Sequence, residues 1–336
     1  MDEIERRHEF VQLSSQEVER LLLPVSGGRR VLSFELLREG RNNTNYKVRC
    51  EGAESPLLLR IFPPESSVCA KERDIARRLE ASSLPIRTVL HADTDGEVFG
   101  RPYLVAPWVE GVSLEVALRA SEVQSAARWG ALTGEVLARL REVTFPLPGD
   151  LVSGEEGAGL DVIPWEHSGQ EVFCGFAAQF LFDGCAAERL GQELAQEVWA
   201  FVKRESPRLD GVLRESFLAH GDFKPENLVV GGNLAAPRIL VVLDWEYAHS
   251  GTQLGDFANL MRDEALVMEP FVSSLVDAYL GTGGELPPQW RALSRLVDIL
   301  SQLEFLSSRS PRGAVHVRAR ERLTQTLRGW ESYLAR

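Results

Sequence analysis

The sequence lacks several features that would place it in common classes of protein. No apolar run approaches the ~20 residues that cross a bilayer, and the charged N-terminus, MDEIERRHEF, is unlike a secretory signal. The chain has no internal repeat and no low-complexity tract. Its four cysteines form no CxxC pair, and no His lies beside them at metal-ligand spacing. We therefore expect a cytoplasmic protein with reduced thiols and no membrane partner, rather than a disulfide framework or a zinc site.

The chain also lacks an excess of positive charge. It has 37 Lys and Arg against 49 Asp and Glu, a net charge of −12. A chain this acidic is a poor ligand for phosphate backbones, so we expect no nucleic-acid partner. Residues 111–336 carry 21 basic and 31 acidic residues, whereas residues 1–110 carry 16 and 18. The acidity of the later part indicates either a solvated surface or a site for a cationic substrate.

The patterns that are present change near residue 110. At 336 residues the chain suggests two domains or one large bilobal domain. Before residue 110, short β-like runs dominate, and one helical pattern interrupts them at 69–81. The β-like runs are 31–37, 45–50, 56–62, 87–93 and 102–109. After Gly111 the apolar spacing is mostly helical, at 121–143, 172–204, 264–280, 288–307 and 314–335.

Two segments of the later part do not follow the helical pattern. A β island at 216–244 holds two apolar strands, 228–230 and 238–244, around the turn 231–233. The segment 146–170 is rich in Pro, Gly and acidic residues and has no periodicity, which is typical of a functional or disordered loop. The sequence thus predicts an α+β fold with a β-rich part at 1–110 and a mainly helical part at 111–336.

The strongest chemical signal is the run HGDFKPEN at 220–227, followed by a strand that ends in Asp244. A carboxylate at Asp222, an amide at Asn227 and a second carboxylate at Asp244 can converge across a β-hairpin. That set suits phosphoryl transfer, with Asp222 accepting the proton of a substrate hydroxyl and the other two holding Mg²⁺ through hard oxygen ligands. Each residue alone would be read as a turn cap or a strand end.

These residues resemble the kinase superfamily, in its aminoglycoside phosphotransferase and choline kinase branch, whose signature is HGDxxxxN followed by a strand ending in Asp. The run also differs from the protein-kinase pattern HRDLKPEN at only two positions. Only eleven residues separate Asp244 from Asp256, and no Ala-Pro-Glu follows, which leaves little room for a peptide platform. The resemblance implies a bilobal, protein-kinase-like fold that uses ATP and Mg²⁺ to phosphorylate a small-molecule acceptor. A nucleotide-binding pseudokinase scaffold is the alternative of another class.

The same resemblance implies nucleotide contacts in residues 1–110. Arg60 occupies the place of the strand lysine that contacts the phosphates, and Glu72 matches the helix glutamate that pairs with it. Asn42, Asn43 and Thr44 lie where the family has its nucleotide-covering loop, although GxGxxG is missing. The hinge is expected to contact adenine through the Pro107 carbonyl and the Val109 N–H.

Four further residues complete the sequence-based hypothesis. Lys224, two residues past the base, is expected to act on the γ-phosphate. Glu246, two residues past the metal aspartate, is expected either to bind an amine of the acceptor or to form a structural ion pair. His220 is expected to brace the catalytic loop, and Asp256 is either a second brace or a plain helix N-cap.

The acceptor itself stays open at this point. An aminoglycoside-like or other natural product is the first choice because of the acidity of the later part. DWEYA is similar to the choline kinase side, which favours choline or ethanolamine, and NNTNY is similar to a loop of bacterial homoserine kinases. Neither the acceptor nor the oligomeric state follows from the sequence.

Overall fold

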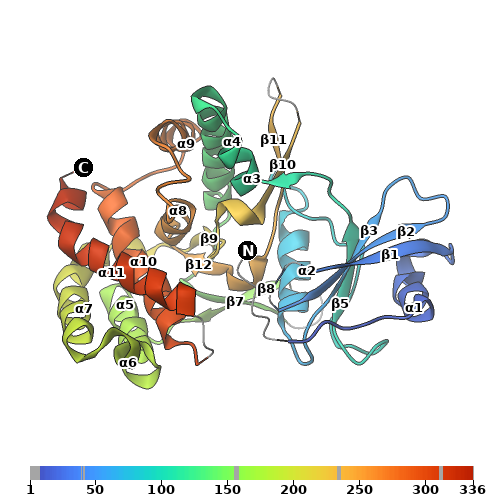
Figure 1. Cartoon of the computed structure of the whole chain (residues 1–336), viewed down its shortest axis with the longest axis horizontal. Coiled ribbons are helices and arrows are strands. Elements are labelled where there is room, and N and C mark those ends of the chain that lie inside the picture. The colour runs from blue at the N-terminus through green and yellow to red at the C-terminus, as the bar shows by residue number, and fades with distance from the viewer. Residues whose placement is uncertain are drawn as a thin grey trace. The chain divides into compact units, whose positions relative to one another are not determined.

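The computed structural model describes residues 8–38, 40, 42–154, 159–232, 236–309 and 313–335 (Figure 1). The chain forms two compact units. Unit 1 consists of Met1–Ser113, Leu151–Asp161 and Leu228–Glu246, and unit 2 of Leu114–Asp150, Val162–Asn227 and Tyr247–Arg336. The sequence-based division had a single boundary after residue 110. Two later segments also belong to unit 1; one contains strand β10 (Leu228–Gly231), which pairs with β6 (Val112–Ser113).

A five-stranded antiparallel sheet forms most of unit 1. Its strand order is β1 (Val31–Leu37), β2 (Thr44–Cys50), β3 (Leu57–Ile61), β5 (Tyr103–Pro107) and β4 (His91–Asp93). Four of these strands follow the expected β-like runs closely, whereas only the end of the run 87–93 forms a strand. Helix α1 (Ser15–Ser26) shares a buried core cluster with the alternate side chains of β2, and its capping box at Ser14 and Glu17 fixes where it begins.

Side-chain alternation along β3 decides where its charged residue points. Leu59 and Ile61 belong to the core cluster on the α1 side of the sheet. Arg60, between them, faces the other side. There α2 (Val68–Leu79) packs through Cys69 against Leu104 and adjoining apolar side chains. The strand therefore places one arginine on the face that α2 covers.

The second sheet of unit 1 has the order β11 (Arg238–Val242), β10 and β6. Its β10–β11 hairpin confirms the two strands of the predicted β island, although Asn233 of the predicted turn lies outside the described residues. A short 3-10 turn at Trp245–Tyr247 follows β11. The backbone N–H of Val242 donates to the Pro85 carbonyl at 2.7 Å, so the loop after α2 is tied to the end of β11.

Unit 2 is mainly helical. Helix α4 (Val123–Arg141) lies beside α9 (Glu269–Gly281) (Figure 1). A Cβ atom on Gly130 or Gly134 would overlap the backbone carbonyls of Phe271 or Leu275, so the two glycines allow this close approach. A separate core cluster joins the helices α5 (Gln170–Ala178), α6 (Ala186–Leu190), α7 (Gln192–Glu205), α10 (Trp290–Ser307) and α11 (Gly313–Leu334). No helix in the described ranges is long and apolar enough to cross a membrane.

The remaining short elements of the described chain lie around the HGD motif and the connections. They are α3 (Leu114–Arg119), β9 (Phe217–Ala219), β12 (His249–Gly251) and α8 (Leu254–Leu260). Strand β12 pairs with β9 on one side and with the first residues of β7 (Gly149–Ser153) on the other.

Two sequence expectations are wrong in detail. The segment 146–170 is not one loop, because it contains β7 and β8 (Leu160–Pro164). Only Leu151 and Gly149 of β7 are buried, too few to leave a readable alternation, and residues 155–158 lie outside the described part. The helical pattern 172–204 is broken into three helices and a π-helical turn at Gln179–Asp183, with interruptions at Gly184 and Gly191.

Candidate active site

The HGD motif of unit 2 forms a tight loop directly after β9. Gly221 has φ +79°, and a Cβ atom there would overlap the Tyr247 carbonyl, so the motif requires glycine at this position. The Asp222 carboxylate accepts hydrogen bonds from Lys224 Nζ at 2.7 Å and from Asn227 Nδ2 at 3.0 Å. Asn227 also donates to the Asp222 carbonyl at 2.9 Å. Three predicted site residues thus meet in one hydrogen-bonded group.

The loop is braced from beneath by buried polar side chains. Asp256 accepts from the backbone N–H groups of His220 at 2.9 Å and of Gly221 at 2.8 Å. Asn259 donates to the Gly221 carbonyl at 2.8 Å. Burial raises the pKa of the Asp256 carboxyl to about 7, although the two backbone donors lower it. Asp256 is therefore a brace, and the N-cap of α8 is Gln253.

His220 also has a structural place. Its side chain is fully buried, and its Nδ1 accepts from the backbone N–H of Asp222 at 3.2 Å. This contact orients the residue that follows Gly221, which agrees with the bracing role expected from the sequence.

Unit 1 contains a second group of predicted residues around Arg60. Arg60 Nη2 lies 3.1 Å from Glu72 Oε1 and 2.9 Å from Asp244 Oδ1. With its amide oxygen turned toward the guanidinium, Asn43 accepts from Nη2 at 2.6 Å and from Nε at 3.2 Å. Burial by itself lowers the pKa of Arg60, but the Glu72 and Asp244 carboxylates raise it above its ordinary value. The arginine is thus a permanent cation with two acidic partners.

The pKa of Glu72, unlike that of Arg60, is shifted toward the neutral form of the side chain. Burial raises the pKa of Glu72 to about 7, against the lowering effect of Arg60. Its helix, α2, is also held through Asp74, which accepts from Arg73 Nε at 2.7 Å and from the Ser153 hydroxyl. This contact between α2 and β7 fixes the rotation of the helix and hence the direction in which Glu72 points.

Asp244 has an unusual backbone. Its φ is +60°, in the left-handed region that a side chain other than glycine rarely adopts. The following Trp245 donates from Nε1 to the Val242 carbonyl at 3.1 Å, which closes the turn. Strained non-glycine residues concentrate at functional sites, so this conformation is evidence independent of the motif.

Residues of the predicted nucleotide-covering loop make different kinds of contact. Asn42 Nδ2 lies 3.4 Å from both carboxylate oxygens of Glu246, so the loop is joined to the turn after Asp244. Thr44 is buried, and its hydroxyl accepts from the Val11 N–H at 3.1 Å, which is a structural contact. Arg41 of this loop lies outside the described residues. Pro107 ends β5 and Val109 lies two residues beyond, so the adenine contacts stay a prediction.

The structure adds residues to the site that the sequence did not indicate. Lys71 donates from Nζ to the Glu246 carbonyl at 3.0 Å. Arg87, in the loop after α2, interacts electrostatically with Arg60, Glu72 and Asp244. Lys71 directly precedes Glu72 in the sequence, and this position next to a predicted site residue was the available signal. Arg87 begins the run 87–93 that was expected to be β-like, but only β4 at its end forms a strand, so the pattern did not indicate where Arg87 points.

The predicted residues thus form two groups, one in each unit. Unit 1 brings together Asn42, Asn43, Arg60, Glu72, Asp244 and Glu246. Unit 2 brings together Asp222, Lys224 and Asn227. The predicted metal ligands Asn227 and Asp244 belong to different units, so their joint role stays a prediction.

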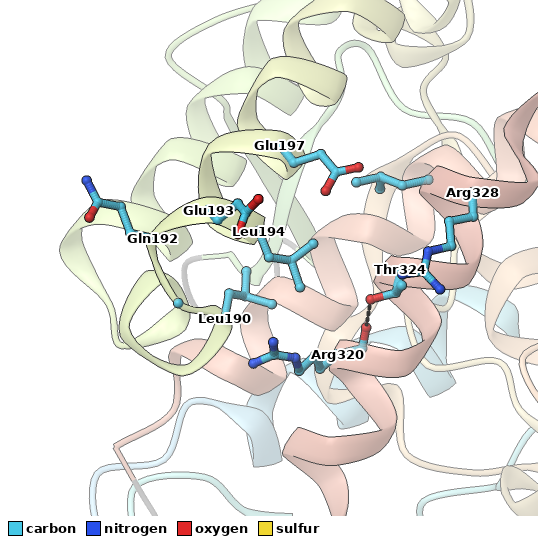
Figure 2. Close-up of a pocket in the computed structure, with 10 residues that line it drawn as sticks. Leu190, Gln192, Glu193, Leu194, Glu197, Arg320, Thr324 and Arg328 are labelled. Atoms are coloured by element: carbon cyan, nitrogen blue, oxygen red, sulfur yellow. Dashed lines mark hydrogen bonds between the residues drawn. The ribbon is translucent and has the colours of Figure 1, made fainter.

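A separate cavity of about 710 Å³ lies in unit 2 between α7 and α11 (Figure 2). Leu190 and Leu194 line it on one side, and Arg320 and Arg328 on the other. None of the predicted site residues lines this cavity.

Comparison with known proteins identifies relatives across most of the chain. The model of the phosphotransferase enzyme family matches residues 33–294. The mouse (Mus musculus) acyl-CoA dehydrogenase family member 10 is 26% identical over 249 residues. That match covers 72% of this chain, but the chain spans only 21% of the length of that relative.

Solved structures show the fold. APH(2″)-IIIa in complex with GDP and kanamycin is 14% identical, with a TM-score of 0.63, and the match covers 94% of this chain and 97% of that one. A candidate fructosamine-3-kinase from Thermobifida fusca is 18% identical, with a TM-score of 0.62 and coverage of 93% and 98%. These likenesses confirm the predicted α+β, protein-kinase-like fold.

Proposed function

Because the chain belongs to the phosphotransferase enzyme family, a family of small-molecule kinases, we propose that it transfers the γ-phosphoryl group of ATP to a hydroxyl of a small cationic acceptor. The observation that carries the proposal is the Asp222 carboxylate, held by Lys224 and Asn227 and braced through Asp256. A carboxylate positioned in this way orients an acceptor hydroxyl and accepts its proton during transfer.

Lys224 has a more specific place than the sequence indicated. Its ammonium lies 2.7 Å from Asp222 Oδ2, so it forms an ion pair with the proposed base. Its side chain is 35% exposed. We propose that it neutralises the carboxylate until the acceptor arrives and then offsets charge on the transferring phosphate. One lysine can do both because it is only two residues from the base.

Mg²⁺ fits the donor chemistry of the proposed ligands. Among the described residues, no group of three or more His, Cys, Asp or Glu side chains is arranged to hold a metal. A nucleotide-bound Mg²⁺ does not need such a group, because it keeps waters and phosphate oxygens as ligands. The Asn227 side chain donates two hydrogen bonds from Nδ2, which turns its amide oxygen to the opposite side. When bound, the metal would neutralise charge on the phosphates.

The residues around Arg60 suit the phosphates of the nucleotide. A guanidinium grips phosphate bidentately, and this one is kept cationic by Glu72 and Asp244. We propose that Asn42 and Asn43 cover the phosphates and that the Pro107 carbonyl and the Val109 N–H contact adenine. The solved relatives with bound GDP, ADP or ATP support nucleotide use.

The acceptor is proposed to be cationic for two reasons. Residues 111–336 have a net charge of −10, from 21 basic and 31 acidic residues, and APH(2″) relatives were solved with kanamycin, streptomycin or gentamicin. Acidic surfaces attract amines and orient them.

A nucleotide-consumption screen tests the proposal. The panel contains aminoglycosides, choline, ethanolamine, homoserine, amino sugars and neutral sugars, each with ATP or GTP and Mg²⁺. Consumption with an amine-bearing alcohol, and phosphorylated product found by mass spectrometry, is the expected result. Tight nucleotide binding without turnover on any acceptor would favour the pseudokinase scaffold, which the intact Asp222, Asn227 and Asp244 disfavour.

A further inference from the structure

The turn that carries Asp244 is held by hydrogen bonds on both sides of that residue. Asp244 has φ +60°, a conformation that persists in a residue other than glycine only where the surroundings impose it. Two residues before it, the Val242 carbonyl accepts from Trp245 Nε1 at 3.1 Å. Two residues after it, the Glu246 carbonyl accepts from Lys71 Nζ at 3.0 Å. Each bond restrains the backbone on one side of Asp244.

The bond from Lys71 differs from the other in its origin and its strength. Trp245 belongs to the turn itself, whereas Lys71 lies in α2 and reaches a residue 175 positions further along the chain. Its donor is an ammonium group, and a charge-assisted hydrogen bond is stronger than one between neutral groups. Through Lys71, therefore, α2 restrains the backbone of the turn.

Helix α2 uses two consecutive residues to hold two parts of the ion cluster in unit 1. Consecutive side chains of a helix point about 100° apart. Glu72 can therefore pair with Arg60 of β3 at 3.1 Å while Lys71 binds the turn after β11. The contact of α2 with β7 fixes the rotation of the helix. One helix thus sets both the arginine and the turn that carries Asp244.

We propose that Lys71 is a positioning residue for the metal ligand Asp244. The inference rests on the proposed function, in which Asp244 holds the Mg²⁺ of the nucleotide. The Asp244 side chain is 44% exposed, so a metal can reach it. Lys71 binds a backbone oxygen and acts on the metal only through the direction in which Asp244 points. It therefore controls the part of nucleotide affinity that depends on the metal.

Binding of ADP with and without metal tests the proposal. Kd is measured by calorimetry in EDTA and again in Mg²⁺ for the wild type, Lys71→Met and Lys71→Arg. Lys71→Met removes the donor and keeps much of the side-chain length. It should raise Kd about tenfold in Mg²⁺ and change it less than about twofold in EDTA, because the lost bond acts only on the metal ligand. Lys71→Arg keeps a charged donor and should recover part of the affinity in Mg²⁺.

A double-mutant cycle shows whether the effect passes through Asp244. Asp244→Asn brings no charge to the metal but keeps the shape of the side chain, and Asn tolerates the left-handed backbone of the turn. In this background Lys71→Met should change Kd in Mg²⁺ less than about twofold. An equal loss in the wild-type and Asp244→Asn backgrounds would overturn the inference.

Lys203→Met is the matched control, because Lys203 is an exposed lysine in the last turn of α7, in unit 2. It should bind ADP like the wild type. Thermal melting of the free proteins identifies a variant that has not folded, and Lys71→Gln, which keeps a neutral donor, then replaces Lys71→Met.

The two conditions separate failure of this inference from failure of the proposed function. An unchanged Kd of Lys71→Met in Mg²⁺, beside a wild type that binds ADP, would refute the inference alone. A loss of the same size in EDTA would also overturn it, because Lys71 would then contact the phosphates itself. If the wild type binds no nucleotide in either condition, the proposed function fails and the inference with it.

Discussion

At the scale of single residues, two aspartates show how environment separates roles, Asp222 in the HGD loop and Asp256 in α8, which holds that loop. Asp222 is 21% exposed and accepts from two side chains, whereas Asp256 is fully buried and accepts from backbone N–H groups. The first can meet a substrate and change partners during a reaction. The second is committed to holding the loop, because any movement would leave buried backbone donors unpaired.

Replacing the proposed base gives the first prediction. Asp222→Asn should lower kcat by about 10²- to 10⁴-fold, because the amide accepts no proton and orients the hydroxyl poorly. The melting temperature and ADP affinity should stay close to wild type, since Asp222 is partly exposed and its contacts are local. Quench-flow measurement of a single turnover checks this. An unchanged rate of phosphoryl transfer would remove Asp222 from the catalytic role.

The raised pKa of Glu72 gives the second prediction, on stability. Its carboxyl has a folded-state pKa of about 7 against an ordinary 4.5, so the folded protein binds this proton more tightly than the unfolded chain does. The free energy of unfolding should therefore fall as the pH rises from about 4.5 to about 7, by up to about 3 kcal/mol from this group. Urea unfolding of the wild type and of Glu72→Gln across that range checks it. The two proteins should differ in slope there, and parallel curves would contradict the prediction.

Which residues lie together could be predicted from the sequence where a strand or helix supplies a period. The family resemblance paired Arg60 with Glu72, and the structure brings them together because β3 alternates and α2 covers that face. Arg87 belongs to the run 87–93 that was expected to be β-like, but it lies in the loop before β4, where no period indicates direction. Glu246 was expected to bind an amine or to form a structural ion pair, and its carboxylate lies beside Asn42, a contact between residues 204 positions apart that no local pattern indicates.

At the scale of elements, packing decides what the apolar pattern leaves open. The pattern of 121–143 predicted α4, but not that α9 would lie so close to it. Glycines four residues apart, Gly130 and Gly134, form a smooth stripe on one helix face. The segment 172–204 is a different case. Its apolar spacing is continuous and predicted one helix, but the structure breaks it at Gly184 and Gly191.

The third prediction concerns this helix contact. Gly134→Ala should destabilise the protein by about 1–3 kcal/mol, because the new methyl group must push α9 away. The effect runs against helix propensity, which favours Ala over Gly by about 1 kcal/mol. Gly211→Ala is the control, since Gly211 has φ −67° and a Cβ there meets nothing within 4 Å. Denaturant unfolding should separate the two, and equal stability would mean that α4 and α9 pack less closely than described.

At the scale of the whole molecule, the chain passes from one unit to the other several times. Asn227 is the last residue of a unit 2 segment, and Leu228–Glu246 then belongs to unit 1. The strongest motif of the sequence therefore spans a unit boundary, with Asp222 on one side and Asp244 on the other. A division by composition alone assigned both to the helical part, because β10 and β11 are short and flanked by helices.

The charge of the whole molecule gives the last prediction. With a net charge of −12, and −10 of it in residues 111–336, the protein should attract a cationic acceptor over distances that salt screens. Raising the ionic strength from 0.01 to 0.15 M shortens the Debye length from about 30 to about 8 Å. The kcat/KM for an amine-bearing acceptor should therefore fall several-fold, while that for a neutral alcohol of similar size stays nearly constant. Glu246→Gln should raise the KM of the cationic acceptor alone; a rise in the KM for ATP instead would mean that Glu246 acts through Asn42. A best acceptor that is neutral or anionic, with kcat/KM independent of salt, would refute the charge argument and leave the phosphotransferase assignment unaffected.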